Sequence, residues 1–337
     1  MELIASTTAI LLLLLALQGG EARVDEAHDN EDKAHQHHEK PRHHHKWDYT
    51  KQGQTAWRDL HEECGGEGQS PIRVSTRHAK TATFPALEMV GYHNPLPSPI
   101  TLTNNGHSVS LSPSENGDLP YIFGGPLHDD FELVSLHFHW GRHNNRGSEH
   151  IINSIRYALE LHIIHRNRKY ATLAEALKHA DGLAVVAFFF QAGERHNMRL
   201  DTLLRSLPLV RHAGDEAKLE RPLPLAWLQP RDIDTFYSYK GSLTTPPCSE
   251  AVTWLLFPHA LHVSFDQMDL FRRLSAGDEP LVDNYRMPQP LNSRLIYVHR
   301  LRGILHSNTT MPHAKHTHHT HETHEDSKEQ EDTEVQN

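Results

Sequence analysis

The stretch from residue 132 to 140 constrains the fold more than any other part of the sequence. It leads into Ser135-Leu-His-Phe-His-Trp-Gly141, in which histidines alternate with large apolar residues. Successive side chains of a β-strand point to opposite faces, so His137 and His139 share one face and the apolar residues share the other. The pattern predicts a strand with one face in a core and two imidazoles side by side on the opposite face, which make half of a metal site.

A second β-prone run, from Tyr157 to His165, can supply a third imidazole. Its alternation puts Glu160, His162 and Ile164 on one face. Three histidines from two strands leave the fourth corner of a zinc tetrahedron open, which is typical of catalytic rather than structural zinc sites. Glu160 lies two residues before His162, where it is placed to accept the other N–H of that ring and fix its tautomer.

Histidine pairs by themselves are weak signals in this chain, which has 31 histidines among 337 residues. Such a pair alone is more often incidental than a binding site. The strand pattern around His137 and His139 distinguishes them from the other pairs. Those pairs lie in polar segments without a β-pattern: His35/His37, His43/His45, His316/His318 and His319/His321.

The rest of residues 46–305 consists mostly of short β-like runs separated by Pro, Gly and Asn. The run from Leu183 to Phe190 is continuously apolar, as expected for a central strand covered on both faces. Only Leu173 to His179 and Phe265 to Leu274 have the apolar spacing of helices. We therefore predict one mixed, β-dominated domain over residues 46–305. The other predicted strands include Ile100–Thr103, Glu132–Trp140, Tyr157–His165, Val252–Phe257 and Arg294–Val298.

The two ends of the chain differ from this body. Residues 1–20 contain an apolar run from Ile10 to Leu17 followed by small residues, as in a secretory signal peptide that is too short to span a bilayer. Glu2 departs from the usual positive start of such a peptide. No later run is long and apolar enough to span a membrane, and the polar C-terminus carries no lipid-anchor signal. We therefore expect a secreted, extracellular protein without a membrane anchor.

Residues 21–45 and 306–337 are polar and rich in histidine, which predicts disorder. Asn308 begins the sole N-glycosylation acceptor, Asn-Thr-Thr. The net charge of −10 belongs mainly to the two ends, and residues 46–305 are close to neutral. The body therefore gives no electrostatic case for nucleic acid as a partner.

The chain has two cysteines, Cys64 and Cys248. In a secreted protein they can pair with each other, which would close a loop of roughly 185 residues. The alternative is two unrelated buried thiols, and the residues alone leave both open.

The loop Gly241-Ser-Leu-Thr-Thr-Pro-Pro247, with its pair of hydroxyls, completes a set of motifs. With it, the chain closely resembles the α-class carbonic anhydrases over about residues 46–305. The resemblance implies one domain around a large, mostly antiparallel twisted sheet with a few peripheral helices, and a metal on its central strands at the bottom of a cone. The other motifs that carry it are Cys64-Gly-Gly-Glu-Gly-Gln-Ser-Pro-Ile72, Asn104-Asn-Gly-His107, Gly124-Gly-Pro-Leu127, His137-Phe-His-Trp-Gly141, Gly147-Ser-Glu-His150, Glu160-Leu-His162, Asp181-Gly-Leu-Ala-Val185, Val252-Thr-Trp254 and Val282-Asp-Asn284.

The resemblance implies an enzyme that reversibly hydrates carbon dioxide to bicarbonate and a proton. In carbonic anhydrases, zinc lowers the pKa of its bound water to about 7, and the resulting zinc-bound hydroxide attacks carbon dioxide. Thr244 matches the residue whose hydroxyl donates to Glu149 and orients that hydroxide. His107 matches the proton shuttle, which suits an imidazole titrating near neutrality. The implied Zn²⁺ ligands are His137, His139 and His162.

Further matched positions complete the expected site. Tyr49 and Asn105 match residues that order a water chain to the shuttle, and Thr245 matches a bicarbonate contact. Asn284, like Glu160, is expected to support a zinc ligand. Cys64 and Cys248 match the pair that forms a disulfide in secreted members. An apolar wall for carbon dioxide is expected from residues that would equally suit an ordinary core: Ile164, Val185, Leu243, Val252 and Trp254.

Two positions depart from the family pattern. Ser135 stands where many members have a glutamine that hydrogen-bonds the first zinc ligand, and the shorter serine puts such a bond to His137 in doubt. Ser110 replaces a polar amide that is common on the hydrophilic wall. We expect both changes to tune affinity or rate and to leave the three ligands intact.

The two end segments lie outside the resemblance, and each contains seven histidines. Such tracts bind zinc, copper or nickel, and they gain positive charge as the pH falls through about 6.5. Extra metal ions or a mineral surface are therefore candidate partners, while the plainer interpretation is a solvated tail. The alternative function is a secreted metal- or mineral-binding matrix protein that acts mainly through these tails.

Overall fold

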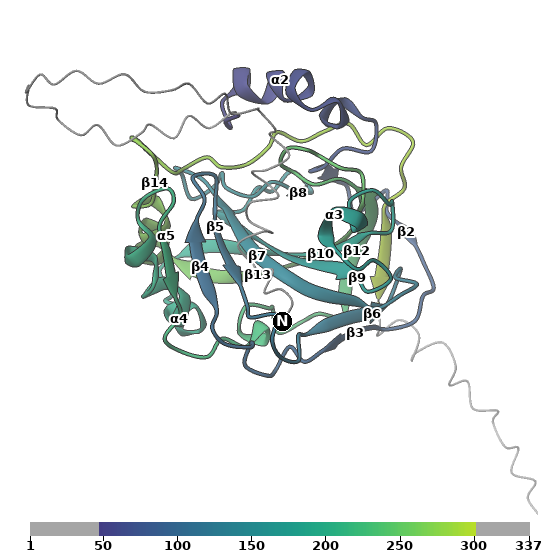
Figure 1. The fold of residues 1–337 in the computed structure, drawn as a ribbon. Coiled ribbons are helices and arrows are strands. Elements are labelled where there is room, and N and C mark those ends of the chain that lie inside the picture. Colours follow the sequence, from purple (N-terminus) through teal and green to yellow (C-terminus); the bar gives the residue numbers. More distant parts are fainter. Residues whose placement is uncertain (1–46, 301–337) are drawn as a thin grey trace, which may run out of the picture. The chain divides into compact units, whose positions relative to one another are not determined.

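The structure is a computed structural model that describes residues 47–300. Within them one 12-stranded sheet dominates (Figure 1). In this sheet β6 (Tyr121–Gly124) pairs with β7 (Phe131–Trp140), and β3 (Leu87–Val90) pairs with β6. The main path of the sheet follows β11 (Glu216–Lys218), β4 (Thr101–Asn104), β5 (Val109–Ser112), β7 (Phe131–Trp140), β9 (Leu159–Asn167), β10 (Leu183–Gly193), β13 (Val252–Ser264), β12 (Thr235–Gly241), β16 (Tyr297–Arg300) and β2 (Lys80–Thr81).

Most neighbouring strands of this sheet are antiparallel. The exceptions within the described part of the chain are two parallel pairs, β10 with β13 and β16 with β2. Two short pairs stand apart from the sheet: β1 (Arg73–Val74) with β8 (Ile151–Ile152), and β14 (Ser275–Ala276) with β15 (Glu279–Pro280). The predicted fold class is confirmed: it is β-dominated, with a large, mostly antiparallel twisted sheet and few helices.

β10 is the central strand that the apolar run Leu183–Phe190 predicts, and the whole run is buried. Its even-numbered side chains pack in one core cluster with Phe138 and Trp140 of β7. Its odd-numbered side chains pack in a second cluster with Trp254 of β13. Because both faces of the strand are covered, every position must be apolar, which removes the usual alternation.

Four helices accompany the sheet in residues 47–300. α3 (Leu173–Ala176) and α5 (Phe265–Arg272) lie in the two segments predicted to be helical. The start of α5 is fixed by a capping box, in which the Ser264 hydroxyl accepts the N–H of Gln267 and Oε1 of Gln267 accepts the N–H of Ser264. The helices are α2 (Lys51–Leu60), α3 (Leu173–Ala176), α4 (Asp201–Leu204) and α5 (Phe265–Arg272), with 3-10 turns at η1 (Glu62–Gly65), η2 (Met198–Leu200), η3 (Leu207–Val210) and η4 (Leu225–Trp227).

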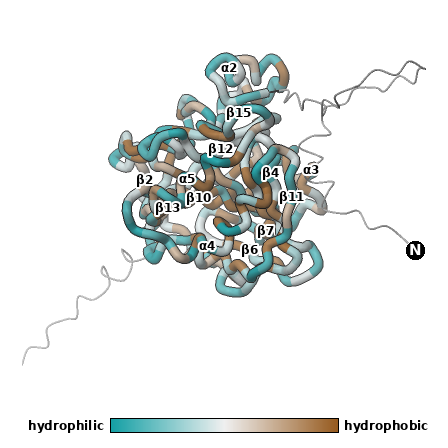
Figure 2. Tube along the Cα trace, turned by 90° about the vertical axis from the view of Figure 1, so that its left-hand side faces the viewer, coloured by the Kyte–Doolittle hydropathy of each residue, from teal (hydrophilic) through white to brown (hydrophobic). Residues whose placement is uncertain are grey.

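The sequence pattern does not predict α2. Trp57 is its one buried residue, and the helix is largely hydrophilic in Figure 2, whereas the inner strands are hydrophobic. The start of the helix is fixed instead by an N-cap, in which the Thr50 hydroxyl accepts the backbone N–H of Gly53.

Some strand ends also differ from the prediction. β9 begins at Leu159 rather than Tyr157, and β16 begins at Tyr297 rather than Arg294. The Arg294 guanidinium donates instead to the backbone carbonyls of Gly68 and Gln69. These long-range contacts hold the segment before β16 outside the strand ladder.

Several predictions fall outside the described residues. They are the signal peptide (1–20), the two histidine-rich segments (21–45 and 306–337) and the glycosylation acceptor Asn308. Within residues 47–300, no helix is both long enough and apolar enough to cross a bilayer.

Candidate metal centre

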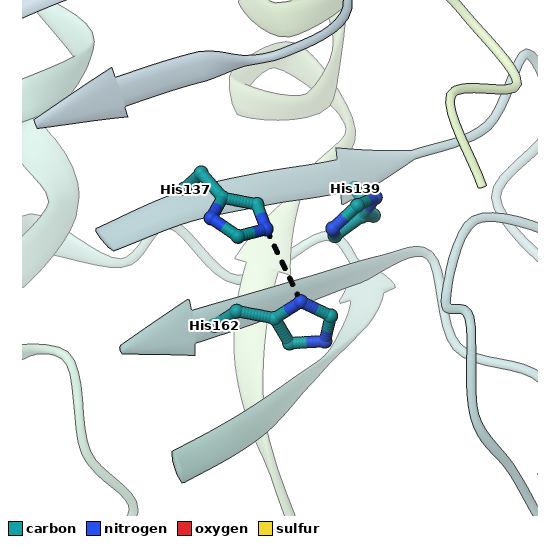
Figure 3. A group of neighbouring side chains, drawn as sticks. All are labelled: His137, His139 and His162. Carbon is teal, nitrogen blue, oxygen red and sulfur yellow. Dashed lines mark hydrogen bonds between the residues drawn. The ribbon is translucent and has the colours of Figure 1, made fainter. Parts of the chain in front are cut away.

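The antiparallel pairing of β7 with β9 brings the three predicted histidines together. His137 and His162 are direct partners in the register of the two strands, and His139 follows on the same face of β7. One ring nitrogen from each histidine lies within 4.8 Å of the others. In Figure 3 the three rings turn toward a common space, and Nδ1 of His162 lies 3.3 Å from Nε2 of His137.

Hydrogen bonds fix the tautomers of two of these rings. Nδ1 of His139 donates to the backbone carbonyl of Asn284 at 2.7 Å, because a carbonyl oxygen can only accept. Nε2 of His162 donates to Oε1 of Glu160 at 2.7 Å. The opposite nitrogen of each ring therefore carries a lone pair. Nε2 of His139 is buried and has no hydrogen-bond partner among the described residues.

An unpaired lone pair in a buried site is costly unless a ligand takes it. Three imidazole nitrogens at this spacing are the donor set that zinc prefers, and an open fourth position is typical of catalytic sites. The residues present therefore fit a zinc ion.

Burial keeps the three histidines in the neutral form that binds metals. It lowers the pKa of His139 to about 3, with a further contribution from His162, against the opposing hydrogen bond to Asn284. It also lowers the pKa of His137 well below its ordinary value and lowers that of His162, where the Glu160 carboxylate opposes the shift.

Glu160 of β9 is the hub that orients one side of this centre. Its buried carboxylate accepts hydrogen bonds from the rings of His150 and His162, each at 2.7 Å. It also accepts the backbone N–H groups of Glu149 and His150, each at 2.8 Å. Burial alone would raise the pKa of Glu160, but these histidines hold it well below the ordinary value. The group is therefore a fixed carboxylate.

Glu149 and Thr244 meet beside the centre. Oε2 of Glu149 lies 3.5 Å from Nε2 of His139, while its Oε1 accepts the backbone N–H of Arg286 at 2.7 Å. Burial and the charge of Glu160 raise the pKa of Glu149 well above its ordinary value, and hydrogen bonds from Arg286 and the Thr244 hydroxyl oppose this. The structure thus places the Thr244 hydroxyl against Glu149.

The loop that carries Thr244 is held by a local hydrogen bond and by a disulfide to a distant part of the chain. Cys248 donates its backbone N–H to the carbonyl of Thr245 at 2.8 Å. Cys248 is also bonded to Cys64, with an S–S distance of 2.04 Å. The predicted disulfide is confirmed, and the alternative of two unrelated thiols is wrong.

His107 lies in a tight turn that Asn105 holds, in which the backbone N–H of Asn105 donates to the carbonyl of Ser108. Oδ1 of Asn105 accepts the backbone N–H groups of His107 and Ser108. The His107 ring stacks on Trp47, with ring centroids 3.6 Å apart and planes 7° apart, and Tyr49 approaches it edge-on at 6.3 Å.

Comparison with known proteins decides the family. The family model for eukaryotic-type carbonic anhydrases matches residues 52–300. Carbonic anhydrase 3 of Homo sapiens is 36% identical over 257 residues, which cover 74% of this chain and 97% of that relative. Carbonic anhydrase 3 of Rattus norvegicus is 37% identical with the same coverage. Carbonic anhydrase 7 of Mus musculus is 36% identical over 257 residues, which cover 74% of this chain and 96% of that relative.

This chain belongs to the eukaryotic-type carbonic anhydrase family. It is accordingly an enzyme with carbonic anhydrase activity, which acts on carbon dioxide and bicarbonate. The site described above lies entirely within the matched residues, apart from the aromatic residues Trp47 and Tyr49 beside His107.

The apolar wall expected of a carbonic anhydrase forms one cluster in the structure. Its three buried members come from β10 and β13, and the Trp254 ring lies 4.7 Å from the His162 ring. Thr245, the expected bicarbonate contact, is half-buried next to Thr244. The clustered residues are Ile164, Val185, Leu243, Val252 and Trp254.

Three supporting residues of this carbonic anhydrase site have no role in the sequence analysis. His150 bridges Glu160 and the Tyr239 hydroxyl, with 2.7 Å to each. Arg286 donates its backbone N–H to Glu149, and its guanidinium donates to the carbonyl of Cys64. His150 lies within a motif, so its position is visible in the sequence. Tyr239 and Arg286 have no local signal, because their partners are far away in the chain.

Asn284 has a larger part than expected. Besides its carbonyl bond to His139, its side chain donates to the backbone carbonyls of His107 and Phe138, and Oδ1 accepts the N–H of Trp140. It therefore ties the ligand strand to the turn that carries His107.

The two departures from the family pattern flank His137. Ser110 of β5 is its register partner, and Ser135 lies at an irregularity in the pairing of β7 with β9. Among the hydrogen bonds within residues 47–300, none joins Ser135 to His137. The effect of the shorter serine on His137 stays a prediction.

Proposed function

We propose that this carbonic anhydrase is a zinc enzyme that hydrates carbon dioxide reversibly, with zinc held by His137, His139 and His162. The observation that carries the proposal is the convergence of three neutral imidazoles, two of them held in the metal-binding tautomer by Asn284 and Glu160. When bound there, zinc supplies a hydroxide nucleophile near neutral pH, as established for carbonic anhydrase, where the pKa of the bound water is about 7.

Glu149 and Thr244 orient the attacking group. A cation held by the three imidazoles would favour the ionised form of Glu149, against the effect of burial on its pKa. The ionised carboxylate can only accept, so the Thr244 hydroxyl donates a hydrogen bond to it and keeps its lone pairs for a second hydrogen bond. Thr244 then accepts a hydrogen bond from the nucleophile and fixes the direction of its lone pair.

The apolar cluster around Val185 and Trp254 holds carbon dioxide, because it offers no hydrogen bonds with which water could compete. Thr245 contacts the bicarbonate product. His107 takes the proton released by each turnover and passes it to solvent, and Tyr49 and Asn105 support the water chain that leads to it. Imidazole is the side chain best suited to exchange protons near neutral pH.

The test is stopped-flow hydration of carbon dioxide, with and without a zinc chelator. We expect fast hydration that the chelator removes and added zinc restores. A His107→Ala variant should lose rate in dilute buffer and regain it with added imidazole. A zinc-loaded protein that shows no hydration would overturn the mechanism and favour the matrix-protein alternative.

We also propose that the enzyme is secreted. The signal-like residues 1–20 and the Cys64–Cys248 disulfide support this, because disulfides are rare in reducing compartments. Glycosylation at Asn308 would follow from that route. Expression in a secreting cell, with sequencing of the N-terminus of the released protein, tests it; retention of Met1 inside the cell would contradict it.

Binding of extra metal ions or a mineral surface by the histidine-rich segments 21–45 and 306–337 is a separate proposal. It rests on their composition alone. Deleting both segments should abolish metal binding beyond one zinc ion per chain. Unchanged metal and mineral binding after the deletion would contradict it.

A further inference from the structure

The helix α2 lies against a segment that supports the metal centre, residues 284–287, which belong to no helix or strand. In Figure 1 the yellow-green chain passes directly below α2. On the inner side of the segment, the Asn284 carbonyl accepts the ring N–H of His139 at 2.7 Å. The backbone N–H of Arg286 donates to Oε1 of Glu149, also at 2.7 Å. A contact that fixes the outer side of this segment therefore bears on the site.

Gln54 of α2 makes that outer contact. Its Nε2 donates to the backbone carbonyls of Tyr285, at 3.3 Å, and Tyr49, at 2.7 Å. Its Oε1 accepts the backbone N–H of Met287 at 2.7 Å. Because a carbonyl can only accept and an N–H can only donate, these partners set the orientation of the amide. One side chain thus binds the backbone on both sides of Arg286.

The peptide group between Tyr285 and Arg286 connects Gln54 to Glu149. This peptide is trans, so its carbonyl and its N–H point in opposite directions. The carbonyl accepts from Gln54 on the outer side, and the N–H donates to Glu149 on the inner side. The group is planar, so any turn of it would misalign both hydrogen bonds, and bonds in such a chain strengthen one another. Gln54 therefore fixes the direction of the N–H that holds Glu149.

We propose that Gln54 is a positioning residue for the hydration reaction and that it acts through this peptide group on Glu149. The inference rests on the proposed function, in which Glu149 and Thr244 orient the nucleophile. With the Arg286 N–H held in place, the Glu149 carboxylate keeps one direction toward the Thr244 hydroxyl. Without Gln54 the peptide group is free to turn, and the hydroxyl that orients the nucleophile loses its fixed partner.

The helix itself does not depend on Gln54. Trp57 is fully buried in α2 and packs edge-on against the rings of Trp47 and Tyr49, at 5.1 and 5.8 Å. The guanidinium carbon of Arg286 lies over the Trp57 ring at 5.3 Å. A substitution at the half-buried Gln54 should therefore leave the helix in place and change only the hold on the peptide group.

The experiment compares the kcat/KM of zinc-loaded, full-length proteins for hydration of carbon dioxide by stopped flow. Concentrated imidazole buffer keeps proton removal from limiting the rate. Gln54→Met keeps the length of the side chain and removes all three hydrogen bonds. Gln52→Met, at an exposed glutamine of the same helix, is the matched control. At equal zinc content we expect Gln54→Met to be roughly 3–10-fold slower, the equivalent of one net hydrogen bond, and the control to match the parent.

A second variant, Gln54→Glu, separates the two sides of the amide. Glutamate still accepts the N–H of Met287, but it has no donor for the Tyr285 carbonyl. We expect it to be at least as slow as Gln54→Met, because the bond to the peptide group between Tyr285 and Arg286 is the one that is lost. A Gln54→Glu protein with the kcat/KM of the parent would overturn the inference.

A third comparison separates positioning from a general structural effect. In a Thr244→Val background Gln54→Met should cause no further loss, because Glu149 then no longer acts on the nucleophile. Equal kcat/KM for Gln54→Met and the control would overturn the inference, and so would an undiminished effect in the Thr244→Val background. A Thr244→Val protein as fast as the parent would instead overturn the proposed role of Thr244 and Glu149, and with it the inference.

Discussion

Replacing Glu160 by glutamine should weaken zinc binding without a change in side-chain size. Oε2 of Glu160 accepts two backbone N–H groups, which cannot become acceptors. The glutamine oxygen must therefore take that side. Its NH₂ group then faces the rings of His150 and His162, where Oε1 now accepts. Nε2 of His162 must accept instead of donate, so its proton moves to Nδ1, the nitrogen that faces the other two imidazoles.

The magnitude follows from this tautomer change. Partners that orient a metal ligand are typically worth 10–100-fold in affinity, a range established partly on carbonic anhydrases. This corresponds to about 1.4–2.7 kcal/mol of zinc binding. Four charge-assisted hydrogen bonds become neutral ones, which should also lower the free energy of unfolding, by about 2–4 kcal/mol.

Competition with a chelator of known affinity measures the zinc constant of Glu160→Gln, and urea unfolding measures its stability. Glu132→Gln is the matched control, because Glu132 lies on the neighbouring strand β7 but faces Arg166 and Arg168. The control should bind zinc like the parent. A folded Glu160→Gln protein with the zinc affinity of the parent would refute the role of Glu160 in setting the tautomer.

Three further predictions concern catalysis, the disulfide and pH. Thr244→Val should lower hydration about 100-fold at unchanged zinc content, because the hydrogen bond that orients the nucleophile is lost; a rate within a factor of two of the parent would contradict its role. Cys64→Ser/Cys248→Ser removes a link between residues 184 apart and should lower the free energy of unfolding by up to about 5 kcal/mol, measured by urea unfolding; equal stability would contradict it. His165 is buried against the Tyr92 hydroxyl, and burial lowers its pKa to about 4. Because the ring has its ordinary pKa of about 6.5 in the unfolded chain, the free energy of unfolding should fall by on the order of 3 kcal/mol as the pH drops from 6.5 to 4. His165→Gln should flatten this part of the pH profile, and an unchanged profile would show that other groups cause it.

Alternation along single strands makes much of the centre predictable. It gives the shared face of His137 and His139 and the face of His162, and the continuous apolar run gives the central place of β10. It does not give the register that pairs His137 with His162, because a period of two fits every even shift between strands. The family resemblance supplies what the pattern lacks.

Contacts between distant residues explain what the sequence does not show. Arg286 reaches Glu149 and Cys64, 137 and 222 residues away, and neither spacing leaves a local pattern. α2 has a single buried side chain, Trp57, so it lacks the apolar stripe by which helices are found. Its place depends on the aromatic packing of Trp57 against Trp47 and Tyr49, which only the fold creates.

Hydration of carbon dioxide by a His139→Ala variant tests the metal centre most directly. His139 is fully buried, and its Nε2 lies at the convergence of the three rings. His93→Ala, which alters an exposed histidine, is the control. We predict that His139→Ala loses its chelator-sensitive hydration while the control keeps the rate of the parent. A folded His139→Ala protein that hydrates carbon dioxide as fast as the control would contradict a catalytic zinc ion on these three imidazoles.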